Sequence, residues 1–78
     1  MIIYLSNIDV DTERLEELYD YDEGVLIIFD TGVPIIAVFL QDNDAETVRA
    51  WLYEDERRTS DGPANWSYIN EMINKTAT

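Results

Sequence analysis

The two longest apolar runs of this chain lie close together near its centre, and they constrain the fold more than any other feature. Residues 25–29 (Val-Leu-Ile-Ile-Phe) and 33–40 (Val-Pro-Ile-Ile-Ala-Val-Phe-Leu) are rich in β-branched and aromatic residues, which favour strands. Only Asp30-Thr31-Gly32 separates them, which predicts a β-hairpin with Gly32 in the left-handed region. Both runs are apolar at successive positions, so both faces of the hairpin must be covered, by helices or by a second copy in a homodimer.

The N-terminal third is predicted to contain a strand and an amphipathic helix. Residues 1–5 form a short apolar run that ends at Ser6. Between residues 12 and 20, apolar residues recur at helical spacing, and Asp11 precedes them as an N-cap. The opposite face of this predicted helix is almost wholly anionic. Its apolar residues are Leu15, Leu18 and Tyr19, and its acidic residues are Glu13, Glu16, Glu17 and Asp20.

Two further helices are predicted after the hairpin. Asn43 and Glu46 have the spacing of a capping box, so a helix should begin there and run to about Arg58. Helix-breaking residues at 59–63 then precede a last helix at 64–75. The predicted apolar faces consist of Val48, Trp51 and Leu52 in the first of these helices, and of Trp66, Ile69, Met72 and Ile73 in the second.

The predicted order of elements is β-α-β-β-α-α. It describes a single α+β domain over residues 1–78, with a three-stranded sheet that contains the hairpin and is packed by helices. The first strand would pair in parallel with its neighbour if the first helix served as a right-handed crossover.

The charge balance determines which partners the chain can attract. Seventeen Asp and Glu residues against five Lys and Arg residues give a net charge of -12, although 46% of the residues are apolar. A chain with that apolar content folds, unlike a disordered acidic tail. Eight of the carboxylates fall within residues 9–23, where Arg14 is the only basic residue. A folded body with this field repels nucleic acid and attracts basic proteins.

Several kinds of catalytic and metal chemistry lack the residues they need. The chain has no cysteine and no histidine, which excludes disulfides, zinc sites and histidine bases. Asp30-Thr31-Gly32 resembles the active-site loop of retroviral-type aspartic proteases, but three glycines in the whole chain cannot supply their glycine-rich flap. Three groups of acids resemble cation ligands, yet none has both the glycine and the final glutamate of a calcium loop; they lie at residues 9–13, 20–22 and 42–46. We therefore expect no enzyme, no metal site and no cofactor.

A segment in the second half of the chain carries a resemblance to a known family. Residues 25–27 read Val-Leu-Ile, residues 42–48 read Asp-Asn-Asp-Ala-Glu-Thr-Val, and residues 51–57 read Trp-Leu-Tyr-Glu-Asp-Glu-Arg. These stretches resemble the phage-encoded DNA-mimicking anti-CRISPR proteins of type I systems. One such protein has a Val-Leu-Ile strand, a hairpin, and Asp-x-Asp-Asp-Ala-Asp-Ser-Ile leading to Trp-Leu-Asp-Asp-Glu-x-Arg. The resemblance covers residues 25–58, is about one helical turn shorter before Trp51, and does not include the N-terminal third.

The resemblance implies an inhibitor that occupies the DNA-binding groove of a CRISPR surveillance complex. The contacts that it implies are Asp42, Asp44, Glu46, Glu54, Asp55 and Glu56. The charge argument adds the first acidic cluster as partner-binding residues, namely Glu13, Glu16, Glu17, Asp20, Asp22 and Glu23. Carboxylates one helical turn apart are about 5–6 Å apart, a spacing that can imitate a short track of phosphates.

The predicted function is therefore an acidic DNA mimic that blocks the DNA-binding surface of a host defence complex, with an anti-CRISPR protein as the favoured kind. Its partner would be a basic nucleic-acid-binding protein, without direct binding to nucleic acid or membrane. No apolar run approaches the roughly 20 residues that span a bilayer, so we expect it in the cytoplasm of the host cell. The alternatives are an inhibitor of a restriction or repair enzyme, an immunity protein or antitoxin covering a basic nuclease site, and a salt-adapted protein. Clustering of the acids at 9–23 argues against salt adaptation.

Overall fold

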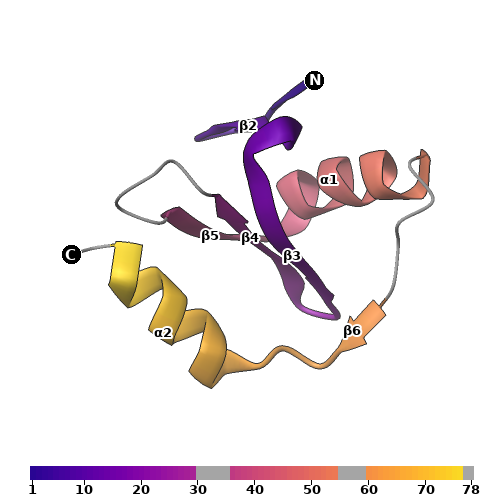
Figure 1. The fold of residues 1–78 in the computed structure, drawn as a ribbon. Helices are drawn as coiled ribbons and strands as arrows, with labels where there is room; N and C mark the ends of the chain where they lie inside the picture. The colour runs from indigo at the N-terminus through magenta and orange to yellow at the C-terminus, as the bar shows by residue number, and fades with distance from the viewer. Residues whose placement is uncertain (30–35, 55–59, 77–78) are drawn as a thin grey trace.

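Figure 1 shows a sheet that lies between two helices, with a small ribbon of two strands at one end. The computed structural model describes residues 1–29, 36–54 and 60–76. In these residues the larger sheet has four strands in the order β5-β4-β3-β6, and the ribbon consists of β1 and β2. The α+β class is confirmed, whereas the predicted three-stranded sheet is wrong.

The predicted hairpin is confirmed. Strands β4 (Gly24–Phe29) and β5 (Ile36–Leu40) pair antiparallel, with a register that runs from Val25 opposite Leu40 to Phe29 opposite Ile36. Every residue of β4 is buried, as expected for a strand that is apolar at successive positions and covered on both faces. The predicted turn at Asp30-Thr31-Gly32 lies outside the described residues.

Each face of the sheet is covered by one helix of the same chain. Helix α1 (Asp42–Glu54) packs its Ala45, Val48 and Leu52 against alternate residues of β4, and helix α2 (Trp66–Thr76) packs Ile69 and Met72 against the others. The residues of β4 on the α1 side are Val25, Ile27 and Phe29, and those on the α2 side are Leu26 and Ile28. The two cores therefore lie on opposite faces of β4, which contributes residues to both.

The predicted apolar faces of these helices are confirmed in their central residues. Trp51 is partly buried beside the α1 core. At the flanks of α2, however, Trp66 is 48% exposed and Ile73 is 37% exposed. Helix α1 begins at Asp42, so Asn43 lies inside the helix and is not its N-cap. Asp42 itself has a positive φ of 53°. The predicted end near Arg58 lies outside the described residues.

The predicted N-terminal helix is wrong. Residues 9–21 instead form strand β2 (Asp9–Asp11), a 3₁₀ turn (Thr12–Arg14) and the seven-residue strand β3 (Leu15–Tyr21). Asp11 does cap the short turn, because its side chain accepts a hydrogen bond from the Glu13 backbone N–H. The crossover and the β-α-β-β-α-α order are therefore wrong as well.

A β-bulge explains why β3 has the apolar spacing of a helix. Leu15 pairs with Phe29 and Glu17 pairs with Ile28, so Glu16 is an extra residue between them. The extra residue turns Leu15 to the same face of the sheet as Leu18, three positions later, and both pack in the α1-side core. A regular strand repeats every two residues, so the bulge produces an i, i+3 pattern that a helix would also give.

The remaining strands complete the two sheets. Strand β6 (Ser60–Gly62) pairs in parallel with the end of β3, and strand β1 (Ile2–Tyr4) pairs antiparallel with β2. The inner side chains of the β1–β2 ribbon, Ile3 and Val10, belong to the α1-side core. The predicted first strand therefore exists, but it does not join the main sheet.

Gly24 is required where β4 begins, because a side chain there would collide with β5. A Cβ atom at this position would press against the carbonyl oxygen of Leu40 and lie 2.7 Å from Cζ of Phe39.

We expect Gly24→Ala to lower the free energy of unfolding by about 1–3 kcal/mol, the usual cost of overpacking. Urea denaturation measures this loss. Gly62→Asn is the matched control, because nothing lies within 4 Å of a Cβ there and its φ of +73° suits asparagine; an equal loss in both variants would contradict the steric explanation.

Candidate functional site

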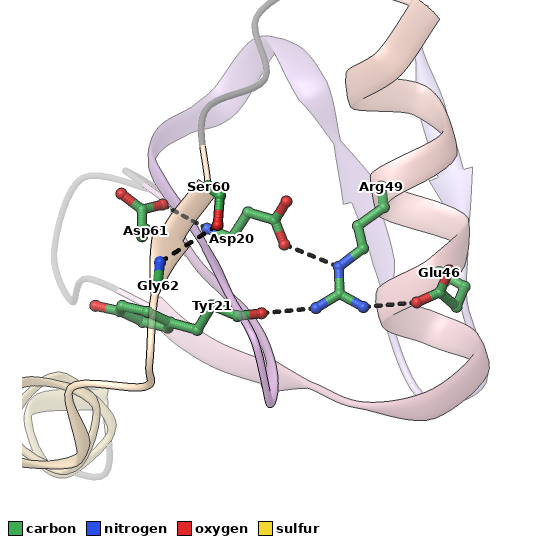
Figure 2. Close-up of polar contacts among 7 residues, drawn as sticks. All are labelled: Asp20, Tyr21, Glu46, Arg49, Ser60, Asp61 and Gly62. Carbon is green, nitrogen blue, oxygen red and sulfur yellow. Dashed lines mark hydrogen bonds and ion pairs between the residues drawn. The ribbon is translucent and has the colours of Figure 1, made fainter.

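Figure 2 shows a buried ion pair that joins α1 to the hairpin of β3 and β4. Arg49 projects from α1, and its Nε donates a hydrogen bond of 2.8 Å to Oδ1 of Asp20 in β3. Its Nη2 donates to the carbonyl oxygen of Tyr21 at 2.7 Å, and its Nη1 donates to Oε1 of Glu46 at 2.6 Å. The guanidinium thus connects the helix to the strand beneath it through three acceptors.

Asp20 is part of the interior rather than of the acidic surface. Its side chain is only 4% exposed, and that of Arg49 is 18% exposed. The hydrogen bond that Arg49 donates to Asp20 is the main reason that the pKa of Arg49 is raised above its ordinary value, against the opposing effect of burial. The backbone N–H of Asp20 also donates to Oδ2 of Asp61 at 2.7 Å, which holds β6 beside β3. The predicted placement of Asp20 on an exposed helix face is therefore wrong.

The other acids of the first cluster divide between the two ends of β3. Glu13, in the 3₁₀ turn, and the bulge residues Glu16 and Glu17 are exposed at its beginning. Asp22 and Glu23 are exposed in the two-residue turn that joins β3 to β4. At about 3.3 Å per residue, the ends of a seven-residue strand are roughly 20 Å apart. The predicted helix face of Glu13, Glu16, Glu17 and Asp20 therefore does not exist, because these residues lie in the 3₁₀ turn and in β3.

Two of these carboxylates are held in place by hydrogen bonds. Glu17 accepts from the hydroxyl of Tyr19 at 2.7 Å and from that of Tyr68, in α2, at 3.4 Å. Glu23 accepts from the backbone N–H of Ala64 at 2.9 Å, just before α2. Both contacts tie the α2 side of the molecule to the ends of β3. These two negative charges consequently have defined positions.

The second cluster lies at the beginning of α1. Asp42 is exposed, and Oδ1 of Asp44 accepts hydrogen bonds from both N and Oγ of Ser6, at 3.1 and 2.9 Å. Acids in the first turn also interact favourably with the helix dipole. Glu46 is exposed but its charge is paired with that of Arg49. Glu54 is the last described residue of α1; nothing is described of its side chain, and Asp55 and Glu56 lie outside the described residues.

The described basic side chains neutralise little of the acidic surface. Arg49 binds Asp20 and Glu46, Arg14 lies 3.9 Å from Asp11, and Lys75 lies 3.8 Å from Glu71. Within residues 1–29, 36–54 and 60–76, no basic side chain is within ion-pair distance of eight exposed carboxylates, namely Asp9, Asp61 and the six predicted partner-binding residues Glu13, Glu16, Glu17, Asp22, Glu23 and Asp42. These six are called the open carboxylates below.

The structure provides neither a clustered metal site nor a membrane span in its described part. Among these residues, no group of three or more Asp and Glu side chains is arranged to hold a metal ion. No described helix is long and apolar enough to cross a bilayer. The exposed carboxylates of this surface can attract positively charged groups.

Three tyrosines pack together beside Glu17. The rings of Tyr19 and Tyr21 stack with centroids 5.9 Å apart, and Tyr68 meets Tyr19 edge-on at 5.4 Å. The hydrogen bond to Glu17 and then the contact with Tyr68 raise the pKa of Tyr19. Burial raises the pKa of Tyr21, followed by the negative charges of Asp61 and of ionised Tyr68.

Alkaline titration should detect these two shifted tyrosines. The absorbance of tyrosinate should continue to rise at pH values well above the ordinary tyrosine pKa near 10. In the Tyr19→Phe/Tyr21→Phe variant, this rise at the highest pH values should be absent. Because the folded state keeps protons that the unfolded state loses, their contribution to stability is complete below about pH 10 and declines as pH rises further. If the double variant showed an equal rise in absorbance at the highest pH values, the raised pKa values could not belong to Tyr19 and Tyr21.

Sequence reasoning missed the central residue of this network, Arg49. Its partner Asp20 is 29 positions away, so no local pattern connects them. The one available signal was that Arg49 is the only basic residue between Arg14 and Arg57.

Comparison with known protein families, with curated proteins and with solved structures finds no match for this chain.

Proposed function

We propose that this protein is an acidic DNA mimic that binds the DNA-binding surface of a host defence complex and keeps DNA away from it. A CRISPR surveillance complex is the favoured target, by the resemblance of residues 25–58. The observation that carries the proposal is the set of open carboxylates, which extend from the 3₁₀ turn to the start of α1. A basic groove built for phosphates attracts such a surface.

The fixed positions of the charges support this proposal. Mimicry requires that carboxylates keep their spacing, because charges on a flexible chain lose conformational entropy on binding. Glu17 and Glu23 are held by hydrogen bonds from Tyr19 and Ala64, and β3 lies within a four-stranded sheet. The sheet thus provides a rigid support for these charges.

Adjacent acids are also compatible with a phosphate-like spacing where β3 is interrupted. Side chains of a regular strand alternate between its two faces, so neighbouring charges at about the 3.4 Å spacing of one DNA strand require a bulge or a turn. Glu16 and Glu17 are adjacent at the bulge, and Asp22 and Glu23 are adjacent at the turn. Each pair presents two negative charges within a short length of backbone.

The test is competition between this protein and DNA for a purified type I CRISPR surveillance complex. With labelled target duplex bound to the complex, the full chain should displace the DNA, and excess duplex should displace the protein. The control is a variant in which the open carboxylates other than Glu23 are changed to amides, since Glu23 also holds the backbone of Ala64. Simultaneous binding of protein and DNA, or no binding of the protein, would show that the proposal is wrong.

A pull-down from host lysate with the tagged chain distinguishes the alternatives. A restriction enzyme, a repair enzyme or a nuclease toxin that is retained and then released by duplex DNA would assign the same chemistry to a different target. A partner that DNA does not release would contradict mimicry itself.

A further inference from the structure

The outer face of the β1–β2 ribbon exposes large apolar side chains beside acids. Tyr4 is 73% exposed, Met1 62% and Ile2 50%. These are the most exposed large hydrophobic residues in the described part of the chain. Exposed apolar groups that lie together in one place, rather than singly, are typical of interaction sites.

The pairing of the ribbon places these residues among carboxylates. Ile2 is opposite Asp11 and Tyr4 is opposite Asp9, while Ile3 and Val10 between them face the core. Because side chains alternate along a strand, Ile2, Tyr4, Asp9 and Asp11 share the outward side. These four residues are called the ribbon face below.

The ribbon is held firmly against the rest of the molecule. N and Oγ1 of Thr12 both donate to the carbonyl oxygen of Met1, at 3.0 and 3.1 Å. At its other end, the backbone N–H of Leu5 donates to the carbonyl oxygen of Ile8, and Ser6 is bound by Asp44 of α1. The ribbon face is therefore formed before a partner arrives, which reduces the entropy that binding costs.

Charge decides what can cover this face. A second copy of the chain would bring another body with a net charge of -12 against Asp9 and Asp11, and like charges in an interface are unfavourable. A basic protein would instead place Lys or Arg beside Asp9 and near Asp11, which Arg14 already approaches at 3.9 Å. Ile2 and Tyr4 would contact apolar surface or the aliphatic stems of its basic side chains. Tyrosine at the centre and charge at the rim is the usual composition of a protein interface.

We propose that the ribbon face is the anchoring surface for the basic, DNA-binding partner, with Tyr4 and Ile2 as its apolar anchors. This inference rests on the proposed function and adds to it a contact that DNA itself could not make. DNA binding depends on charge, whereas the ribbon face adds binding energy that salt does not screen. It thus gives the protein a means of outcompeting the duplex that it imitates.

The experiment measures binding to the purified type I surveillance complex, fixed to a sensor surface, for the full chain and two variants. Ile2→Thr/Tyr4→Thr removes the apolar anchors and keeps residues that favour strands. Trp66→Gln/Ile73→Gln is the matched control, because it removes exposed apolar side chains from α2, on the other side of the sheet. The melting temperature of each variant confirms that it is folded.

The ribbon variant should bind roughly tenfold or more weakly, as expected for anchor residues, with an unchanged dependence on salt. The α2 control should bind like the original chain. The anchoring role of the ribbon face would be wrong if the ribbon variant bound as tightly as the original chain, or if the control lost more affinity. The proposed function would still hold in that case, provided that DNA displaces the original chain. If the original chain does not bind, or if DNA fails to displace it, the proposed function is wrong and the inference is overturned with it.

Discussion

Replacing Arg49 by methionine should lower the free energy of unfolding by about 3–5 kcal/mol, because it leaves the carboxylate of Asp20 buried without the guanidinium. Asp20 is 3% exposed, so water cannot replace the hydrogen bond of 2.8 Å that Arg49 supplies. The carbonyl oxygen of Tyr21 also loses a donor. A domain of this size has only about 3–5 kcal/mol of net stability, so a large part of the variant should be unfolded at 25 °C.

Chemical denaturation followed by circular dichroism measures this loss. Arg14→Met is the matched control: it removes the same charge from a side chain that is 67% exposed and 3.9 Å from its partner Asp11, where the expected change is below about 1 kcal/mol. The double variant Asp20→Leu/Arg49→Met should recover part of the loss, since replacing a buried pair with apolar groups is often tolerated. Similar losses in Arg49→Met and Arg14→Met would contradict a structural role for the buried pair.

Binding to the DNA-binding partner should weaken by about 10²-fold when monovalent salt rises from 50 to 200 mM, because most of the attraction is between charges. A DNA ligand that makes six to ten phosphate contacts loses about 10³–10⁵ over this range. We expect a smaller loss here because a protein surface with six open carboxylates does not carry the condensed counterions of a duplex.

Single amide substitutions identify which carboxylates produce this salt dependence. Glu13→Gln, Glu16→Gln and Asp42→Asn should each reduce the slope of log affinity against log salt, if those open carboxylates face the partner. Glu71→Gln is the control with the same change of charge, since Glu71 lies on α2 beside Lys75. Affinity that does not change with salt, or a slope that only Glu71→Gln reduces, would contradict an interface built on the open carboxylates.

The parts of the fold that could be predicted are those whose sequence pattern has one structural interpretation. Residues 25–29 are apolar at every position and close to a second such run, and only a hairpin buried on both faces suits this arrangement. Helix α2 shows Ile69 and Met72 at i, i+3, with the polar residues Asn70 and Glu71 between them. In such segments the local pattern and the tertiary packing agree.

The N-terminal third could not be predicted because one inserted residue imitates another periodicity. Glu16 places Leu15 and Leu18 on the same face of a strand, and a single sequence does not distinguish such a bulge from a helical turn. Strand β6 could not be predicted either, since its residues Ser60, Asp61 and Gly62 are of types that are typical of turns. Its parallel pairing with β3 and the hydrogen bond from the Asp20 backbone N–H to Asp61 hold this segment beside β3.

The candidate site was predictable in its composition but not in its arrangement. The sequence identified a strongly acidic surface, and the exposed positions of Glu13, Glu16, Glu17 and Asp42 agree with that part of the prediction. It could not separate Asp20 from them, because burial depends on Arg49, which is distant along the chain. The partner-binding roles of these residues stay predictions.

The sharing of β4 by both cores has a consequence for how the protein is made. Leu26 and Ile28 are covered by Ile69 and Met72, which leave the ribosome some forty residues after β4. Until then this face of the nascent sheet is open to water and to other apolar surfaces, which favours aggregation or chaperone binding. Slow translation of residues 60–76 would prolong the time during which Leu26 and Ile28 are uncovered. The folding of the last helix therefore determines when a newly synthesised chain is protected from misassembly.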